Sequence, residues 1–477
     1  MSKKDKIRVS FGHNSENVTG SYTLIECGSS GKNILVDFGM IQENVSLLKE
    51  YQLNGKRPHF KPKDINYVFI THAHIDHSGR IAMLYNWGCE APIIIPDGSK
   101  ELIEAMLLDS ANICTRDAED LSRKLKKEYY PLCTEDDVYN CIQYIKESSV
   151  SEKHRLDENI EYQLNYNSHI FKSVSITFWI QNGSQKRKII ITGDIGNLSV
   201  PRKFTEPFVN FESCNLLVGE ATYADQRRSN YKDRQKDLEK IKSEIETCCI
   251  DNKGRILIPA FAFGRSPTML SILYDIFHED KSFNVPIIYA SPLGCKLLDI
   301  FLSKLEEEDK QYLNEVLSWQ NIKVLSNFDE FEKELRDNKP KIFVAPSGMM
   351  TAGYSVYAAT QLLPHSNDCI MFCGYSSDGS LARKIKEKKT KTITVDGKSI
   401  HSRCQVVTLK SFSSHIQYED LLDIYSGKSG QIYDKIALVH SSQKDKLLFA
   451  HSLQNECEKR NKNTKVIAVN QGTVITL

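Results

Sequence analysis

Four side chains that are able to bind a metal ion lie within six consecutive positions in the first part of the sequence. They are His72, His74, Asp76 and His77, which form the pattern His-x-His-x-Asp-His. Imidazole and carboxylate groups are the ligands that a borderline divalent ion such as zinc takes in proteins. Because so dense a cluster rarely arises among ordinary solvated side chains, the segment predicts a metal site.

The elements around this cluster must bring its side chains together. An apolar segment, Tyr67–Ile70, precedes the cluster and is typical of a buried strand, and residues 78–87 after it have a helical pattern. On a turn between a strand and a helix, the four side chains are able to converge on one point. We therefore expect the metal site at the carboxyl edge of a sheet.

Short apolar segments bounded by Gly, Asn, Asp or Pro predict strands in the first half of the chain. The expected strands are Lys6–Phe11, Ser21–Glu26, Asn33–Asp37, Tyr67–Thr71, Pro92–Ile95, Ser173–Ile180, Lys188–Thr192 and Leu216–Gly219. Residues 99–148 have a charged helical pattern instead, and Thr134, which precedes three acids, predicts a helix start.

The pattern changes from about Tyr231 to Gln361, where long amphipathic helices alternate with buried apolar strands. These strands are expected at Arg255–Pro259, Val285–Ala290 and Lys341–Ala345. Such alternation is typical of a parallel, doubly wound sheet and predicts a second domain. Short strands are expected again at Gln405–Leu409, Lys435–Val439 and Val466–Ala468. We therefore expect the middle domain to be inserted into the first.

The composition excludes several classes of protein. The 62 basic and 61 acidic side chains nearly cancel, so bulk charge does not attract nucleic acid or membranes, and any polyanion must be bound locally. No apolar run approaches the roughly 18 residues of a membrane-spanning helix, and no apolar signal core follows the amino terminus. None of the 13 cysteines forms a Cys-x-x-Cys pair, which favours reduced thiols. We expect a cytoplasmic protein with no membrane partner.

The His-x-His-x-Asp-His pattern resembles the second motif of the metallo-β-lactamase superfamily. Asp37, His169 and Asp194 are similar to the residues of its first, third and fourth motifs. Later segments resemble the β-CASP nucleases, a branch of this superfamily. These segments are Glu220–Tyr223, Pro259–Arg265, Ser291–Leu293, Ser347–Gly353, Gly374–Tyr375, Gly379–Leu381, Phe412–His415 and Leu438–His440.

This resemblance implies an α/β fold, in which a metallo-β-lactamase αβ/βα sandwich carries an inserted β-CASP domain built on a mostly parallel sheet. The expected borders assign residues 1–215 and 392–477 to the metallo-β-lactamase domain and 216–391 to the β-CASP domain. The resemblance also implies two divalent ions, Zn²⁺ by expectation. One ion would take His72, His74, His169 and Asp194, the other would take Asp76, His77, Asp194 and His440, and Asp37 would orient the metal loop from behind.

The expected catalytic residues are Asp76, Glu220 and His415. Glu220 would orient His415, which would protonate or stabilise the leaving 3′ oxygen. Arg265, Ser347 and Gly348 stand at expected strand ends, where anion-binding nests form, and are predicted to bind phosphate. In the competing explanation, the glycines there only permit tight turns. The Lys386–Lys391 run is more typical of a solvated face than of a nucleic-acid patch.

The function expected from these observations is a zinc-dependent ribonuclease that hydrolyses single-stranded RNA and leaves a 5′ phosphate and a 3′ hydroxyl. Endonucleolytic cleavage is favoured, while 5′-exonucleolytic action stays open, as does a homodimer. The alternatives are a catalytically silent RNA-binding subunit and a hydrolase of the same fold that acts on DNA or a small phosphodiester. The chain departs from the family pattern at Lys172, Gln417, Ser441 and Ser442, which puts efficiency and substrate choice in question more than metal binding.

Overall fold

The computed structural model of the chain describes residues 6–15, 17–43, 45–198, 203–224, 231–350, 353–374, 376, 380–387, 391–395 and 398–477. The chain divides into two compact units. The first consists of Met1–Pro201, Thr205–Arg227 and His415–Leu477, and the second of Arg202–Phe204 and Arg228–Ser414. Four residues of the predicted motifs, Thr351, Ala352, Tyr375 and Gly379, lie outside the described residues, as do Lys388 and Lys389.

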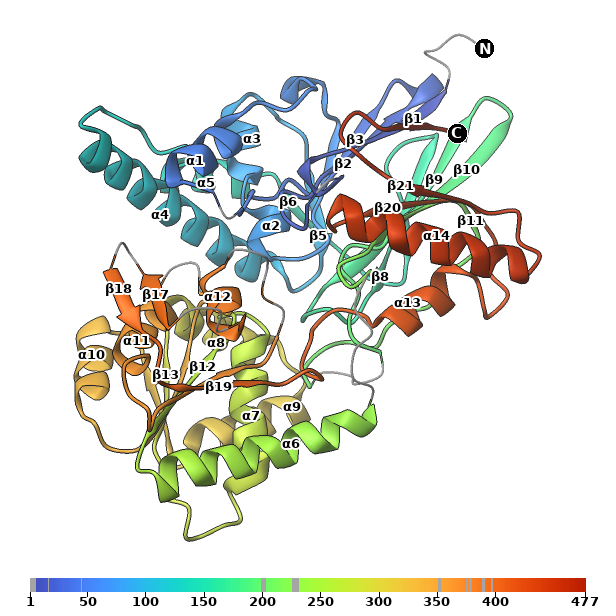
Figure 1. Cartoon of the computed structure of the whole chain (residues 1–477). Coiled ribbons are helices and arrows are strands. Elements are labelled where there is room, and N and C mark those ends of the chain that lie inside the picture. Colours follow the sequence, from blue (N-terminus) through green and yellow to red (C-terminus); the bar gives the residue numbers. More distant parts are fainter. Residues whose placement is uncertain are drawn as a thin grey trace. The chain divides into compact units, whose positions relative to one another are not determined.

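The first unit contains two seven-stranded sheets (Figure 1). The first sheet has the order β22-β1-β2-β3-β4-β5-β6, with β1 (Ile7–Phe11), β2 (Thr23–Cys27), β3 (Asn33–Val36), β4 (Tyr67–Phe69), β5 (Ile93–Pro96), β6 (Ile145–Ser148) and β22 (Val474–Thr476). The second sheet has the order β21-β20-β11-β10-β9-β8-β7, with β7 (Lys153–Arg155), β8 (Ile160–Tyr166), β9 (Val174–Asn182), β10 (Gln185–Ile191), β11 (Cys214–Glu220), β20 (Tyr433–Val439) and β21 (Lys465–Ala468).

The two sheets of the first unit pack face to face. Alternate residues of both sheets form one apolar core, to which Val36 and Phe69 contribute from the first sheet and Ile176 and Val218 from the second. Helices cover the outer faces (Figure 1); they are α1 (Leu47–Gly55), α2 (Ile75–Ser78), α3 (Ile81–Asn86), α4 (Lys100–Leu125), α5 (Glu135–Ile142), α13 (Tyr418–Tyr425) and α14 (Gln443–Lys459). The predicted αβ/βα sandwich is therefore confirmed.

The second unit is built on a six-stranded sheet in which all neighbouring strands run parallel. Its order is β14-β13-β15-β12-β16-β19, with β12 (Arg255–Pro259), β13 (Ile287–Ala290), β14 (Ile322–Leu325), β15 (Lys341–Ala345), β16 (Cys369–Phe372) and β19 (Gln405–Thr408). Its helices are α6 (Tyr231–Ile245), α7 (Arg265–Phe277), α8 (Pro292–Lys304), α9 (Glu307–Ser318), α10 (Phe328–Arg336), α11 (Tyr354–Leu362) and α12 (Leu381–Glu387). A separate antiparallel hairpin contains β17 (Thr392–Val395) and β18 (Lys398–His401).

Most of the predicted elements are confirmed, including the helix start at Thr134, whose side chain forms a reciprocal capping box with Asp137. The sequence patterns missed β6, β7, β8, β14, β16, β17, β18 and β22. Most of these strands are only three or four residues long and have exposed positions, so they resemble loops. By contrast, β16 is apolar and fully buried, and its four residues were too few to stand out. Among the described residues, no helix is long and apolar enough to cross a membrane.

The predicted domain borders differ from the compact units. The border at 215/216 falls inside β11, which pairs with β10 and β20 in the first unit. The border at 391/392 precedes β17, β18 and β19, all of which belong to the second unit. The expected strand Gln405–Leu409 was wrongly placed in the first domain, since β19 pairs in parallel with β16. Strand pairing, which local sequence does not reveal, decides these borders.

Candidate active site

The carboxyl ends of three neighbouring strands in the first unit carry polar side chains. β10, β11 and β20 lie side by side in the second sheet and run in the same direction. Asp194 lies just beyond the end of β10, Glu220 is the last residue of β11, and His440 follows directly after β20. Because parallel strands end at the same edge of a sheet, these three side chains come together.

The His-x-His-x-Asp-His cluster lies between β4 and the end of α2, and Asp37 holds its first turn in place. Asp37 Oδ1 accepts a hydrogen bond from the Thr71 backbone N–H (2.8 Å), and Asp37 Oδ2 accepts one from the Thr71 hydroxyl (2.9 Å). Gly39 allows close approach, because a Cβ atom there would lie 1.6 Å from the Asp76 carbonyl oxygen. Asp37 and Gly39 thus fix the cluster against the end of β3.

A first set of donor atoms brings together His72, His74, His169 and Asp194. His74 Nδ1 lies 3.1 Å from His72 Nε2 and 3.2 Å from His169 Nε2. Asp194 Oδ2 lies 3.5 Å from His169 Nε2 and 3.8 Å from His72 Nε2. His169 comes from the loop between β8 and β9, so three separate segments of the chain supply this set.

A second set uses the other oxygen of Asp194, together with Asp76, His77 and His440. His77 Nε2 lies 3.3 Å from both His440 Nε2 and Asp194 Oδ1. His440 Nε2 lies 3.6 Å from Asp194 Oδ1 and 3.5 Å from Asp76 Oδ2. Asp194 therefore stands between the two sets and presents one carboxylate oxygen to each.

These distances fit divalent ions with nitrogen and oxygen ligands. Four donors at about 2.0–2.1 Å from one ion in a tetrahedron are separated by about 3.3–3.4 Å from one another. The separations within both sets, 3.1–3.8 Å for the pairs given, lie around that value. The buried Asp194 Oδ1 atom has the ring nitrogens of His77 and His440 at 3.3 and 3.6 Å, an arrangement that suits a shared cation.

The imidazoles of the first set are held in the form that binds metals. Burial lowers the pKa of His74 to about 4, against the opposing effect of Asp76 and Asp194. Burial, with the neighbouring His77, holds the pKa of His72 well below its usual value, and burial with His415 does the same for His169. All three rings are therefore neutral at pH 7 and have a nitrogen lone pair available.

The second set differs in its charge. Burial acts to lower the pKa of His77, but the carboxylates of Asp194 and Asp37 outweigh it and raise that pKa well above its usual value. The pKa of His440 is likewise raised despite burial, by Asp194 and Asp76. Burial acts to raise the pKa of Asp194, yet His440 and His77 hold it well below its usual value. The carboxylates around this set therefore favour a positive charge there, which a bound cation would supply.

Glu220 and His415 form a third group beside the shared carboxylate. His415 Nδ1 lies 3.2 and 3.3 Å from the two Glu220 carboxylate oxygens and 4.0 Å from Asp194 Oδ2. Glu220 Oε1 also accepts a hydrogen bond from the Ile195 backbone N–H at 2.6 Å, which fixes the carboxylate. The His415 side chain is 15% exposed, whereas that of Glu220 is 1% exposed. Only His415 of the pair is therefore positioned to meet a substrate.

Two threonines that the motif analysis did not assign support the histidines. The Thr71 hydroxyl lies 3.1 Å from His72 Nδ1, and the Thr222 hydroxyl lies 2.9 Å from His440 Nδ1. Each hydroxyl faces the ring nitrogen that is not directed at a donor set, so it fixes the orientation of the ring. The Glu-Ala-Thr-Tyr motif was the available signal for Thr222, but only the structure reveals its partner.

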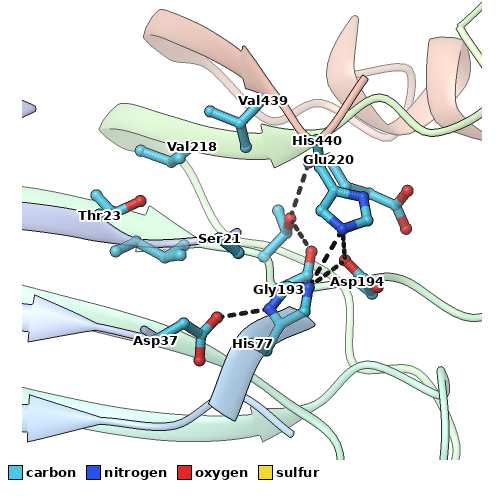
Figure 2. A pocket seen from close by; sticks show the side chains of 12 residues that line it. Ser21, Thr23, Asp37, His77, Gly193, Asp194, Val218, Glu220, Val439 and His440 are labelled. Atoms are coloured by element: carbon cyan, nitrogen blue, oxygen red, sulfur yellow. Dashed lines mark hydrogen bonds and ion pairs between the residues drawn. The ribbon is translucent and has the colours of Figure 1, made fainter. Parts of the chain in front are cut away.

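A small internal cavity of about 20 Å³ lies beside the second set. Figure 2 shows His77, Asp194 and His440 on one side of it and Ser21 and Thr23 on the other. Its volume suffices for about one water molecule. The cavity is therefore not a substrate channel.

The exposed edge of the site is formed by the partly exposed residues His74, Asp76 and His415.

The predicted phosphate-binding residues belong to the second unit, as Arg265 begins α7 and Ser347 and Gly348 follow β15. The Arg265 guanidinium is buried, and it donates hydrogen bonds to the Cys373 carbonyl and to the Ser414 hydroxyl, both at 3.2 Å. The Ser347 carbonyl accepts a hydrogen bond from the Ser355 hydroxyl (2.8 Å). Phosphate binding by these residues stays a prediction.

The departures from the family pattern are accommodated without loss of a proposed ligand. Lys172 adopts a positive φ of 59°, and its ammonium donates to the Tyr166 hydroxyl at 3.2 Å and lies 3.5 Å from Glu206. Ser442 caps α14 through its hydroxyl, and Gln417 is buried at the start of α13. Ser441 is buried as well.

Comparison with protein families gives two matches. The family described as the metallo-beta-lactamase superfamily matches residues 16–111, which include the His-x-His-x-Asp-His cluster. The family described as the Beta-Casp domain matches residues 268–385, in the second unit. Both parts of the predicted resemblance are thus confirmed.

Several characterised proteins are similar to the chain over most of its length. The transcription termination factor FttA of Methanocaldococcus jannaschii is 26% identical over 95% of this chain and 70% of its own length. The ribonuclease TTHA0252 of Thermus thermophilus is 25% identical, over 92% of this chain and 94% of its own. The cleavage and polyadenylation specificity factor subunit 3-II of Arabidopsis thaliana is 24% identical over 90% of this chain and 67% of its own length.

Proposed function

Because the chain belongs to the β-CASP branch of the metallo-β-lactamase superfamily, we propose that it is a metal-dependent ribonuclease that hydrolyses phosphodiester bonds of single-stranded RNA. The observation that carries this proposal is the pair of donor sets with Asp194 between them, next to the Glu220–His415 pair. The similarity to a protein named as a ribonuclease supports the choice of reaction.

The residues present suit two zinc ions, which would supply the charge that activates water and stabilises the phosphoryl oxygens. His72, His74, His169 and Asp194 would hold one ion, and Asp76, His77, Asp194 and His440 the other. The choice of zinc follows from five imidazoles in a site that also offers two carboxylates. Asp37 and Thr222 would keep His77 and His440 directed at the second ion.

The chain's own proton donor for the reaction is His415. Its Nδ1 atom faces Glu220, and Nε2 is the nitrogen proposed to act on the substrate. The Glu220 carboxylate orients the ring, and the Nε2–H group of His415 gives its proton to the leaving 3′ oxygen. The products would then carry a 5′ phosphate and a 3′ hydroxyl, and we propose endonucleolytic cleavage.

The test is to incubate the metal-analysed protein with end-labelled single-stranded RNA and to map the products. Internal cuts with 5′ phosphate ends are expected, and Asp76→Ala should abolish them while the fold is kept. Mononucleotides released from the 5′ end would instead establish 5′-exonucleolytic action. A protein that carries two ions but cleaves no RNA would be the silent RNA-binding subunit.

Choice of sugar needs a matched comparison, because a related hydrolase could act on DNA. His440 favours RNA by its resemblance to the terminal Val-His element of the RNA-processing branch. One sequence made as RNA and as single-stranded DNA should be compared at equal salt, because backbone contacts depend on salt. Equal or faster cleavage of the DNA would overturn the RNA assignment. A cytoplasmic location and a homodimer stay predictions, the second testable by light scattering.

A further inference from the structure

A short segment of the second unit is far more basic than the chain as a whole. Residues 383–403 contain eight Lys or Arg and only two Asp or Glu, a net charge of +6, whereas the whole chain has a net charge of +1. The rest of the chain is therefore net negative. A charge imbalance this large in 21 residues creates a local positive potential that the near-neutral total conceals.

The structure anchors this segment through its apolar side chains. Ala382 and Ile385 of α12 and Ile393 and Val395 of β17 belong to one buried core cluster, against which Ile400 of β18 packs. The antiparallel pairing of β17 with β18 completes the hairpin (Figure 1). The segment is thus held on the unit by the apolar side chains of its inward face. We name α12, β17, β18 and the residues up to Arg403 the basic hairpin.

The outward positions of the basic hairpin carry cations and hydrogen-bond donors. The exposed residues among those described are Lys384, Glu387, Lys391, Thr392, Thr394, Lys398, Ser399, His401 and Arg403. Lys391 and Arg403 lie at the same end of the hairpin, since the Ser402 backbone N–H donates to the Lys391 carbonyl (2.9 Å). The one acid among its described residues, Glu387, is paired with Arg383 at 2.8 Å.

The cations of the basic hairpin fall into two groups, those whose contacts support the fold and those without an ion-pair partner among the described residues. Lys386 donates to the Gly374 carbonyl at 2.6 Å and lies over the Phe372 ring, so it supports the fold. Lys384, Lys391, Lys398 and Arg403, by contrast, have no carboxylate within ion-pair distance among the described residues. A solvated face normally mixes both signs of charge more evenly, whereas Glu387 is the one acid among the described residues of this face.

We propose that the basic hairpin is an RNA-binding surface that contacts the phosphate backbone of single-stranded RNA. The inference rests on the proposed function, which makes RNA the polyanion that this chain handles. Lysine, arginine and hydroxyl groups are the side chains that contact phosphates, whereas the hairpin contains no Phe, Tyr or Trp ring on which bases would stack. Binding there is therefore independent of base sequence and strongly dependent on salt.

The test is the triple variant Lys384→Gln, Lys391→Gln and Lys398→Gln in the full chain. The matched control is Lys281→Gln, Lys296→Gln and Lys339→Gln, which removes the same charge from exposed lysines elsewhere in the second unit. Binding of a fluorescent single-stranded RNA is measured in an Asp76→Ala background, so that the RNA is not consumed. Each phosphate contact contributes about fivefold to the affinity at 0.1 M salt.

The hairpin variant should bind RNA about 10- to 100-fold more weakly, and its log–log salt slope should fall by about 2, equally for RNAs of different sequence. The control variant should change affinity less than about twofold. Equal losses of RNA affinity in the two variants would overturn the proposal. An unchanged RNA affinity in both variants would also overturn it, and an acidic protein would then be the partner to test at the basic hairpin. An unchanged unfolding temperature would show that the triple variant keeps its fold. If the triple variant does not fold, the three single replacements are tested instead, and each is expected to lower the salt slope by about 0.7.

Failure of this proposal is distinguishable from failure of the proposed function. Without the Asp76 replacement, the hairpin variant should cleave the small diester bis(p-nitrophenyl) phosphate at the wild-type rate, because that reaction needs only the site of the first unit. A wild-type chain that neither binds nor cleaves RNA would refute the proposed function. A wild-type chain that does both, with an unaffected hairpin variant, would refute only the RNA-binding surface.

Discussion

The metal-binding loops of the first unit and the basic hairpin of the second use charged side chains in opposite ways. In the first, His77, Asp194 and His440 are almost fully buried, and each has several charged or polar neighbours at fixed distances. In the second, Lys384, Lys391 and Lys398 are exposed and form no ion pair with another described residue. Burial with partners fixes geometry for chemistry, whereas exposure without partners keeps charge available for a flexible polyanion.

The largest effect should follow from removing the carboxylate that both donor sets share. Asp194→Ala should lower RNA cleavage by about 10⁴-fold or more, because one oxygen is lost from each set. Metal analysis should show fewer than two ions per chain, while RNA affinity through the basic hairpin should change little. Full metal content with wild-type cleavage would show that Asp194 does not bridge the sets.

A smaller loss, in the rate alone, is expected at the proton donor. His415→Ala should lower kcat by about 10² to 10⁴-fold, because the leaving oxygen then departs without a proton. Metal content should stay at the wild-type value, since His415 lies outside both donor sets. If the variant loses metal instead, His415 is a ligand, and the separation between donor sets and proton donor is wrong.

The contact between Thr222 and His440, which orients a residue of the second donor set, can be tested without replacing any proposed metal ligand. Thr222→Val keeps the side-chain shape but removes the hydroxyl that faces His440 Nδ1 at 2.9 Å. Affinity for one ion should fall by about 10- to 100-fold in a metal titration, and Thr222→Ser should restore it. Equal affinities in all three proteins would show that the fold alone orients His440.

The smallest effect concerns stability and should separate the two units. Removal of metal by a chelator should lower the unfolding temperature of the first unit by about 5–10 °C, because each ion at 100 times its Kd adds about 2.7 kcal/mol to the stability of that unit. The second unit, which contains neither donor set, should unfold as before. Calorimetry with and without chelator resolves the two transitions, and an equal shift of both would show that the units unfold together.

The sequence by itself was enough to predict the ligand types and the class of fold. The His-x-His-x-Asp-His cluster spans six positions, so its spacing on a strand-to-helix turn limits where its side chains point, and the alternation of helices and strands predicted the parallel sheet of the second unit. These features depend on residues that are near neighbours in the chain. The missed strands, such as β7 and β14, are short and have exposed charged positions that local patterns do not distinguish from loops.

Only the tertiary structure decided which distant residues meet. Asp194, Glu220 and His440 converge because β10, β11 and β20 are neighbours in one sheet, and no local pattern encodes that order. The pairing of Thr222 with His440 joins positions 218 residues apart. The lysines near α12 resembled an ordinary solvated face until the core contacts showed which side of the hairpin is outward and which cations are already paired. Sheet order and burial are properties of the whole fold, since each depends on many weak contacts between segments far apart in the chain.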